Sequence, residues 1–147
     1  MKQTLTTQFA SHNYSRPIRT LVVDDSVMFF ANFCAYLEQQ PLFRVVGIAV
    51  NGKEALHMAE SLEPDLVLMD LSMPVMDGLQ ATAILRRRMP NTRIIIMTMD
   101  DPAKAEAEAL AHGAHGFIWK PKIMNDLTTE VRRAFDLDHT KDERSSS

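Results

Sequence analysis

Apolar runs of four to seven residues recur along the chain, separated by polar stretches that carry scattered apolar residues. The runs are rich in β-branched and aromatic residues, and they cover 18–23, 43–49, 66–69, 93–98 and 116–119. Short, nearly continuous apolar runs of this kind are typical of parallel strands that are buried on both faces. The pattern therefore predicts five buried parallel strands.

The stretches after these runs carry apolar residues at spacings of three and four, which indicates helices with one buried face. Five helices are predicted, and they begin after Ser26, Gly52 and Gly78 and near Ala103 and Met124. The apolar stripe of the first helix combines Val27, Phe30, Ala31, Cys34 and Leu37. Ser26 suits the N-cap of this helix, and Gly113 ends the fourth. Strict alternation of strand and helix predicts a doubly wound α/β fold.

The length of 147 residues suits one domain of common size. We assign residues 16–137 to this domain. Residues 1–15 and 138–147 are mostly polar, and we expect them to be flexible tails. The hydrophobic content of 46% and the charged content of 24% are ordinary for a soluble globular protein, which is the class that we expect.

The net charge and the cysteine content indicate which cellular environment and which partners to expect. The formal net charge of −3 argues against a broad electrostatic affinity for nucleic acid. Cys34 is the one cysteine of the sequence, so it cannot form an intramolecular disulfide, which suits a reducing compartment. No apolar run approaches the roughly 18 residues of a membrane span, and residues 1–16 lack the apolar core of a signal peptide. We therefore expect a cytoplasmic protein.

Charged residues stand at the ends of three predicted strands. Asp24 and Asp25 follow the first apolar run, Asp70 follows the third, and Lys120 follows the fifth. Because ligands of an open parallel sheet bind beyond the carboxyl ends of its strands, these four side chains should converge. Clustered carboxylates beside an ammonium suit Mg²⁺ and a phosphoryl group.

Each of these residues also has a simpler explanation. Neighbours within a strand point to opposite faces, so one of Asp24 and Asp25 could serve only to cap the following helix. Lys120 could be a solvated lysine before a turn. Acids and a lysine at equivalent strand ends favour one shared site over separate structural roles.

Four motifs in this order make the chain similar to a known family. They are Val22-Val23-Asp24-Asp25-Ser26, Asp70-x-x-Met73-Pro74-x-Met76-Asp77-Gly78, Ile96-Met97-Thr98 and Lys120-Pro121. From about residue 18 to residue 135, the chain resembles a bacterial response-regulator receiver domain, the phosphoacceptor module of two-component signalling. The resemblance implies a flavodoxin-like fold, with five helices around a five-stranded parallel sheet of order 2-1-3-4-5.

The resemblance also implies a role for each site residue. Asp70 corresponds to the aspartate that accepts the phosphoryl group. Asp25 and Asp70 would give carboxylate oxygens to Mg²⁺, and Asp24 would act mainly through water. Ser72 would add its backbone carbonyl. Attack of a carboxylate on an anionic phosphoryl donor requires positive charge of this kind.

Thr98 and Lys120 correspond to the hydroxyl and the ammonium that bind phosphoryl oxygens in the family. Phe117 holds the aromatic position whose rotamer follows phosphorylation, although it could instead be a fixed core residue. We expect this switch to reshape the surface around the predicted helix 103–112 and strand 116–119. The resemblance further implies a cis peptide bond before Pro121.

Met99 departs from the family pattern, because the residue after the switch threonine is usually small. Its side chain should narrow the path to the phosphoryl group. Asp100 and Ser72 hold positions that often modulate self-dephosphorylation in the family. We expect these three residues to adjust the lifetime of the phosphorylated form.

The expected function is that of a response regulator that accepts a phosphoryl group from a histidine kinase or a phosphotransfer protein. It would not be an enzyme, apart from weak self-phosphorylation and self-dephosphorylation. The signal would pass to a downstream protein through helix 103–112, strand 116–119 and the last helix, and phosphorylation could produce a dimer. Residues 138–147 are too few for a helix-turn-helix unit, so we expect a stand-alone receiver that contacts neither nucleic acid nor membrane.

Two other functions compete with this interpretation. A haloacid-dehalogenase-like phosphatase also uses an aspartate nucleophile, with a second aspartate two residues later, but Ser26 stands two residues after Asp24. A pseudo-receiver would be an interaction scaffold that never receives phosphate. Such domains usually lose an acid or the lysine, and this chain keeps the full set.

Overall fold

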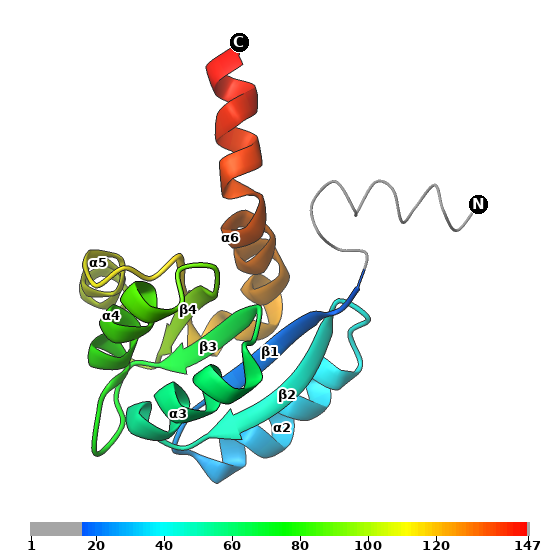
Figure 1. The fold of residues 1–147 in the computed structure, drawn as a ribbon. Helices are drawn as coiled ribbons and strands as arrows, with labels where there is room; N and C mark the ends of the chain where they lie inside the picture. Colours follow the sequence, from blue (N-terminus) through cyan, green and yellow to red (C-terminus); the bar gives the residue numbers. More distant parts are fainter. Residues whose placement is uncertain (1–15, 147) are drawn as a thin grey trace.

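Five parallel strands form one sheet in the computed structural model, which describes the backbone of residues 16–146 and the side chains of residues 16–135. The strands are β1 (Ile18–Val23), β2 (Phe43–Ala49), β3 (Leu66–Asp70), β4 (Arg93–Thr98) and β5 (Gly116–Trp119). Their order across the sheet is β2-β1-β3-β4-β5 (Figure 1). Every neighbouring pair is parallel. The predicted strands, their direction and their order are confirmed.

Helices cover both faces of this sheet (Figure 1). They are α2 (Val27–Glu38), α3 (Gly52–Leu62), α4 (Gly78–Arg88), α5 (Pro102–Ala111) and α6 (Ile123–Ser146), with one 3₁₀ turn, η1 (Lys120–Lys122). One core lies between the sheet and α3, α4 and α5, and a second lies between the sheet and α2 and α6. This arrangement confirms the α/β fold class and explains why the strands are apolar on both faces. Among the described residues, no helix is long and apolar enough to cross a membrane.

Local sequence signals set the helix limits. The Ser26 Oγ accepts the Phe29 N–H at 3.2 Å and caps α2. Asp77 and Gln80 form a reciprocal capping box at the start of α4. Gly113 follows α5 with a φ of +100°, a conformation that favours glycine. The predicted roles of Ser26 and Gly113 are confirmed.

The buried face of α2 differs from the predicted stripe. Phe30, Phe33 and Leu37 are buried, whereas Val27 is 78% exposed and Ala31 is also exposed. The first turn of α2 lies beyond the last residue of β1, so the sheet no longer covers it. The predictions for Val27 and Ala31 were wrong because helical spacing alone does not show which part of a helix lies against the sheet.

The last helix runs farther than the predicted domain limit. The sequence analysis assigns residues 138–147 to a tail, whereas the backbone of α6 is helical to Ser146. The chain has no proline or glycine from residue 123 to residue 146, so no helix breaker ends α6 before this point. The predicted tail at residues 1–15 lies outside the described residues, and the domain limits remain predictions.

The loop between β3 and α4 returns very close to the strand that it leaves. Gly78 donates its N–H to the Leu71 oxygen at 2.9 Å. A Cβ on Gly78 would lie 2.1 Å from the backbone oxygen of Asp70. Only a residue without a side chain allows this approach, so Gly78 fixes the strand end that carries Asp70.

Gly78→Ala should therefore destabilise the fold by about 3 kcal/mol, because the backbone at Asp70 has to move. Gly47→Ala is the matched control. An added Cβ at Gly47 meets the flexible ends of Met58 and Leu62, and the change should cost only about 1 kcal/mol. Urea unfolding of both variants measures the difference, and equal losses would contradict the special role of Gly78.

Candidate functional site

Three aspartates converge at the carboxyl end of the sheet. Asp24 and Asp25 follow β1, and Asp70 is the last residue of β3, the strand next to β1 in the sheet. One carboxylate oxygen from each aspartate lies within 4.8 Å of the others. Asp24 and Asp70 are buried and Asp25 is exposed, so the group opens to solvent on the side of Asp25.

Lys120 joins this group from the end of β5. Its Nζ lies 2.5 Å from Asp24 Oδ2 and 3.1 Å from Asp70 Oδ1, and its side chain is 10% exposed. The alternative of a solvated lysine is therefore wrong. Asp24 also does more than support a helix, since its Oδ1 accepts the Ser26 N–H at 2.8 Å while its Oδ2 contacts Lys120.

The electrostatics of the site are dominated by surplus negative charge. Burial above all, together with the nearby carboxylates of Asp24 and Asp25, raises the pKa of Asp70 to about 6, while Lys120 acts in the opposite direction. Burial disfavours the Lys120 ammonium, but its contacts with Asp24 and Asp70 outweigh this effect and raise its pKa. Lys120 is therefore charged at neutral pH, and the negative charge of Asp70 lowers the stability of the folded state.

These side chains suit a divalent cation. With all four groups ionised, three negative charges face one positive charge. Carboxylate oxygens are the hard ligands that Mg²⁺ prefers, and the exposed side of the group leaves room for the waters that Mg²⁺ retains. The acidic trio is consistent with the Mg²⁺ site expected of a receiver domain.

The predicted switch residues lie on the neighbouring strands. Thr98 is the last residue of β4 and is buried, and its Oγ1 accepts the Asp100 N–H at 3.0 Å. Phe117 lies on β5, half-buried, and packs against the core beneath α3, α4 and α5. Both residues are placed as the resemblance implies, and their switching roles remain predictions.

The three predicted modulators lie on the loops around the site. Ser72 is exposed in the loop that follows β3, and Asp100 is exposed in the loop that follows β4. Met99 is 65% exposed in the same loop as Asp100. All three residues are open to solvent on loops that follow strand ends, and their effects on phosphate chemistry remain predictions.

The peptide bond before Pro121 corrects one expectation. No cis peptide bond occurs among the described residues, so this bond is trans. Pro121 lies within η1, which begins at Lys120. The fixed φ of proline suits the first residues of a helical turn, so a trans proline fits here without disturbing the chain.

Sequence reasoning missed one neighbour of the site. The Phe29 ring lies over the Lys120 ammonium, with 4.5 Å between Nζ and the ring centroid. The motifs quoted above do not include Phe29, and its place in the first turn of α2 gave no reason to connect it with Lys120. The only usable signal was its position four residues after Asp25.

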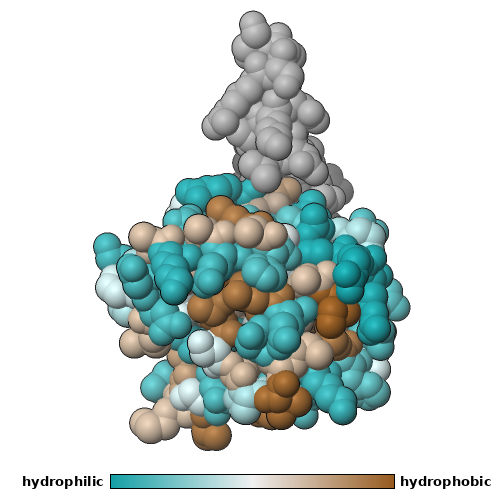
Figure 2. Space-filling model, turned by 90° about the vertical axis from the view of Figure 1, so that its left-hand side faces the viewer, coloured by the Kyte–Doolittle hydropathy of each residue, from teal (hydrophilic) through white to brown (hydrophobic). Residues whose placement is uncertain are grey.

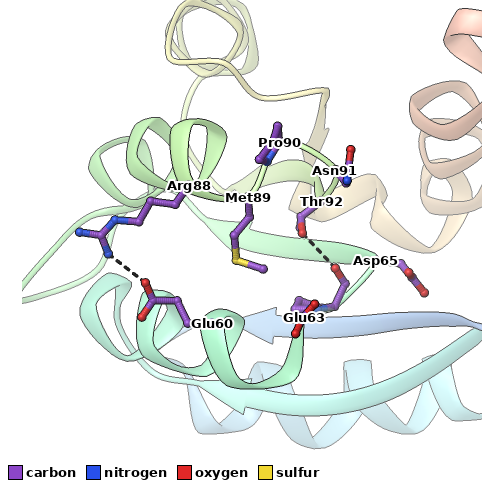
Figure 3. Close-up of a pocket in the computed structure, with 9 residues that line it drawn as sticks. Glu60, Glu63, Asp65, Arg88, Met89, Pro90, Asn91 and Thr92 are labelled. Atoms are coloured by element: carbon purple, nitrogen blue, oxygen red, sulfur yellow. Dashed lines mark hydrogen bonds and ion pairs between the residues drawn. The ribbon is translucent and has the colours of Figure 1, made fainter.

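A separate hollow of about 440 Å³ lies at the opposite end of the sheet (Figure 3). It is bounded by the ends of α3 and α4, where Arg88 pairs with Glu60 at 3.2 Å and the Thr92 hydroxyl donates to the Pro64 oxygen at 3.0 Å. These two contacts join polar groups of its lining to each other, and it contains none of the predicted site residues. The candidate site is therefore the acidic group and not this hollow.

Asp70→Asn should stabilise the Mg²⁺-free fold by about 2 kcal/mol near neutral pH, because it removes a buried negative charge. The pKa of Asp70 is about 6 in the folded state and 3.8 ordinarily. The folded protein takes up the Asp70 proton as the pH falls through about 6, so the gain should shrink at lower pH. Urea unfolding in the presence of a chelator, at neutral and acidic pH, measures this. A destabilised variant at neutral pH would contradict the assignment.

Comparison with known proteins assigns the chain to a family. The model of the response regulator receiver domain matches residues 20–132. The chain is 38% identical over 121 residues to a protein-glutamate methylesterase/protein-glutamine glutaminase of Aliivibrio fischeri, covering 82% of this chain and 32% of that protein. It is 34% identical over 119 residues to the response regulator protein VraR of Staphylococcus saprophyticus, covering 81% of this chain and 57% of that one. The chain thus spans about a third of the methylesterase relatives.

Solved structures give the same result. The response regulator domain of Thermotoga maritima CheB has a TM-score of 0.76 and 34% identity, covering 82% of this chain and 98% of that one. The CheX–CheY–BeF3–Mg²⁺ complex of Borrelia burgdorferi has a TM-score of 0.73 and 26% identity, covering 81% of this chain and 90% of that one. The sequence motifs, the strand order and these matches together show that the chain belongs to the response regulator receiver domain family.

Proposed function

We propose that this receiver is a phosphoacceptor that takes a phosphoryl group onto the carboxylate of Asp70. The donor would be a histidine kinase or a phosphotransfer protein of a two-component system. The observation that carries the proposal is the convergence of Asp24, Asp25 and Asp70 with the Lys120 ammonium at the carboxyl end of the sheet.

Asp25, Asp70 and the Ser72 backbone carbonyl would hold Mg²⁺ directly, and Asp24 would do so mainly through water. The bound ion supplies the positive charge that lets two anionic groups approach. The Borrelia burgdorferi complex contains BeF3 and Mg²⁺ together, which supports this assignment for a similar fold. Asp24 is also tied to Lys120, so it links the ion site to the ammonium.

The reaction would then need only groups that are already close together. An Asp70 oxygen attacks phosphorus, a new P–O bond forms, and the bond from phosphorus to the donor nitrogen breaks. Lys120 lies 3.1 Å from Asp70 Oδ1 and would compensate charge on the transferred group. Water later attacks the acyl phosphate and restores the Asp70 carboxylate. The protein contributes positioning and charge compensation, which is the main catalytic demand of phosphoryl transfer.

Thr98 and Phe117 would convert phosphorylation into a change of surface. The Thr98 hydroxyl now accepts the Asp100 N–H, and it would move toward a phosphoryl oxygen in order to donate to it. The space that this frees would allow the half-buried Phe117 to move inward. Such an exchange between two packings needs only a small free-energy difference.

The output would be protein binding through α5, β5 and α6. The side of the molecule that carries α4 and α5 shows apolar patches between polar side chains, which suits a regulated protein contact (Figure 2). Leu110 on α5 is 51% exposed. A phosphorylation-dependent dimer is one form that this binding can take.

The phosphatase alternative loses its basis, because the chain belongs to the receiver family. The pseudo-receiver alternative differs from the proposal only in whether phosphate is accepted. Phosphate uptake therefore decides between the two.

With Mg²⁺ and a small phosphodonor such as acetyl phosphate, intact mass should show one phosphoryl group on the parent protein and none on Asp70→Asn, because an amide cannot attack phosphorus. Asp25→Ala should incorporate almost none, since a Mg²⁺ ligand is lost. Asp101→Asn, which changes an exposed aspartate outside the acidic group, should behave like the parent. Full incorporation into Asp70→Asn, mapped to another residue, would refute the assignment.

Thr98→Ala should still accept phosphate but should weaken the structural response. Trp119 pairs with Thr98 in the β4–β5 register, so its fluorescence reports on this region. The parent should show a fluorescence change on phosphorylation, and Thr98→Ala should show a much smaller one. Thr92→Ala, at the other end of the sheet, is the matched control. An undiminished change in Thr98→Ala would mean that Thr98 does not couple the site to the surface.

A further inference from the structure

The first turn of α2 places an aromatic ring against the candidate site. The Lys120 Nζ lies 4.5 Å from the centroid of the Phe29 ring. This ring in turn stacks on Phe33, with 4.9 Å between centroids and 24° between planes. Phe33 is 1% exposed, so the support beneath Phe29 belongs to the packed core. The ring over Lys120 is therefore held by the core rather than free to turn.

Three further contacts fix α2 relative to the site. The Ser26 backbone N–H donates to Asp24 Oδ1 at 2.8 Å, and the Ser26 Oγ accepts the Phe29 N–H at 3.2 Å. About two turns after Phe29, the Tyr36 hydroxyl donates to the Met124 oxygen at 3.2 Å. The helix that carries Phe29 is thus joined both to the acidic group and to the segment that follows Lys120.

The ammonium of Lys120 lies between carboxylate oxygens and an aromatic face. A lysine side chain has many rotamers, and the carboxylates alone do not select one of them. The Phe29 face attracts the cation and adds a third contact to those with Asp24 and Asp70. The ammonium is therefore directed toward the space next to Asp70 Oδ1, where the phosphoryl group would form.

We propose that Phe29 is a positioning residue for phosphoryl transfer, which it assists by holding the Lys120 ammonium in place. This inference rests on the proposed phosphoacceptor function. The Phe29 side chain has no polar group with which to bind the three aspartates, so it acts through Lys120. It should affect the rate of phosphorylation while leaving the affinity for Mg²⁺ unchanged.

The test compares Phe29→Leu, Phe29→Tyr and Phe135→Leu. Phe135 is the matched control, because its ring also lies near a cation, Arg93, at 5.7 Å, but at the other end of the sheet. The rate of phosphate incorporation from acetyl phosphate is followed by intact mass at equal Mg²⁺. Phe29→Leu should be slower by about fivefold, the size expected for a partly buried cation–π contact. Phe29→Tyr and Phe135→Leu should match the parent within about twofold.

A second measurement reports the contact without phosphate. In the parent, the protons next to the Lys120 Nζ should show an upfield ring-current shift by NMR. The shift should vanish in Phe29→Leu and persist in Phe29→Tyr. Retention of the shift in Phe29→Leu would overturn the proposal, because Phe29 would then not be the ring over Lys120.

The kinetic outcomes separate the two proposals. If the parent accepts phosphate and Phe29→Leu does so at the parent rate, the positioning role of Phe29 fails and the phosphoacceptor function stands. Equal slowing in Phe29→Leu and Phe29→Tyr would also overturn it, since the ring would not be the cause. If the parent accepts no phosphate, the phosphoacceptor function fails, and the role of Phe29 fails with it.

Discussion

The buried ion pairs of Lys120 with Asp24 and Asp70 are the contacts on which the rest of the site depends. They join the ends of β1, β3 and β5, and they are formed by side chains that are almost fully shielded from solvent. Removing Lys120 would leave the carboxylates of Asp24 and Asp70 without a buried counter-charge, which is strongly destabilising. The position of the ammonium therefore determines both the electrostatics of the acidic group and the geometry of the strand ends.

The same arrangement explains why the site lowers the stability of the fold. Three carboxylates share one ammonium, and the raised pKa of Asp70 reflects first its burial and then this surplus of negative charge. A divalent cation would balance the surplus negative charge of the site. The positive charge of the cation would in turn favour the binding of an anionic phosphoryl group. Functional groups of this kind commonly reduce stability for the sake of activity. The tight approach of Gly78 to the Asp70 backbone shows how the loop after β3 holds Asp70 in place.

The relatives place this receiver module next to different outputs. The chain spans about a third of the methylesterases and somewhat more than half of VraR, so what those whole proteins do does not transfer to it. What the chain shares with them is the receiver domain. Under the proposed function, the output surface is that of α5, β5 and α6.

The sequence by itself determined the five strands, the helix caps at Ser26 and Gly113 and the four charged residues, because hydrophobic period, capping and strand-end chemistry are local. Only the tertiary structure decided which side chains meet. Lys120 and Asp24 are 96 positions apart, and the place of the Phe29 ring and the exposure of Val27 follow from where α2 lies against the sheet. The peptide bond before Pro121 is trans, whereas the family resemblance implied a cis bond. Contacts of this kind depend on the distance and angle between elements, which no local pattern encodes.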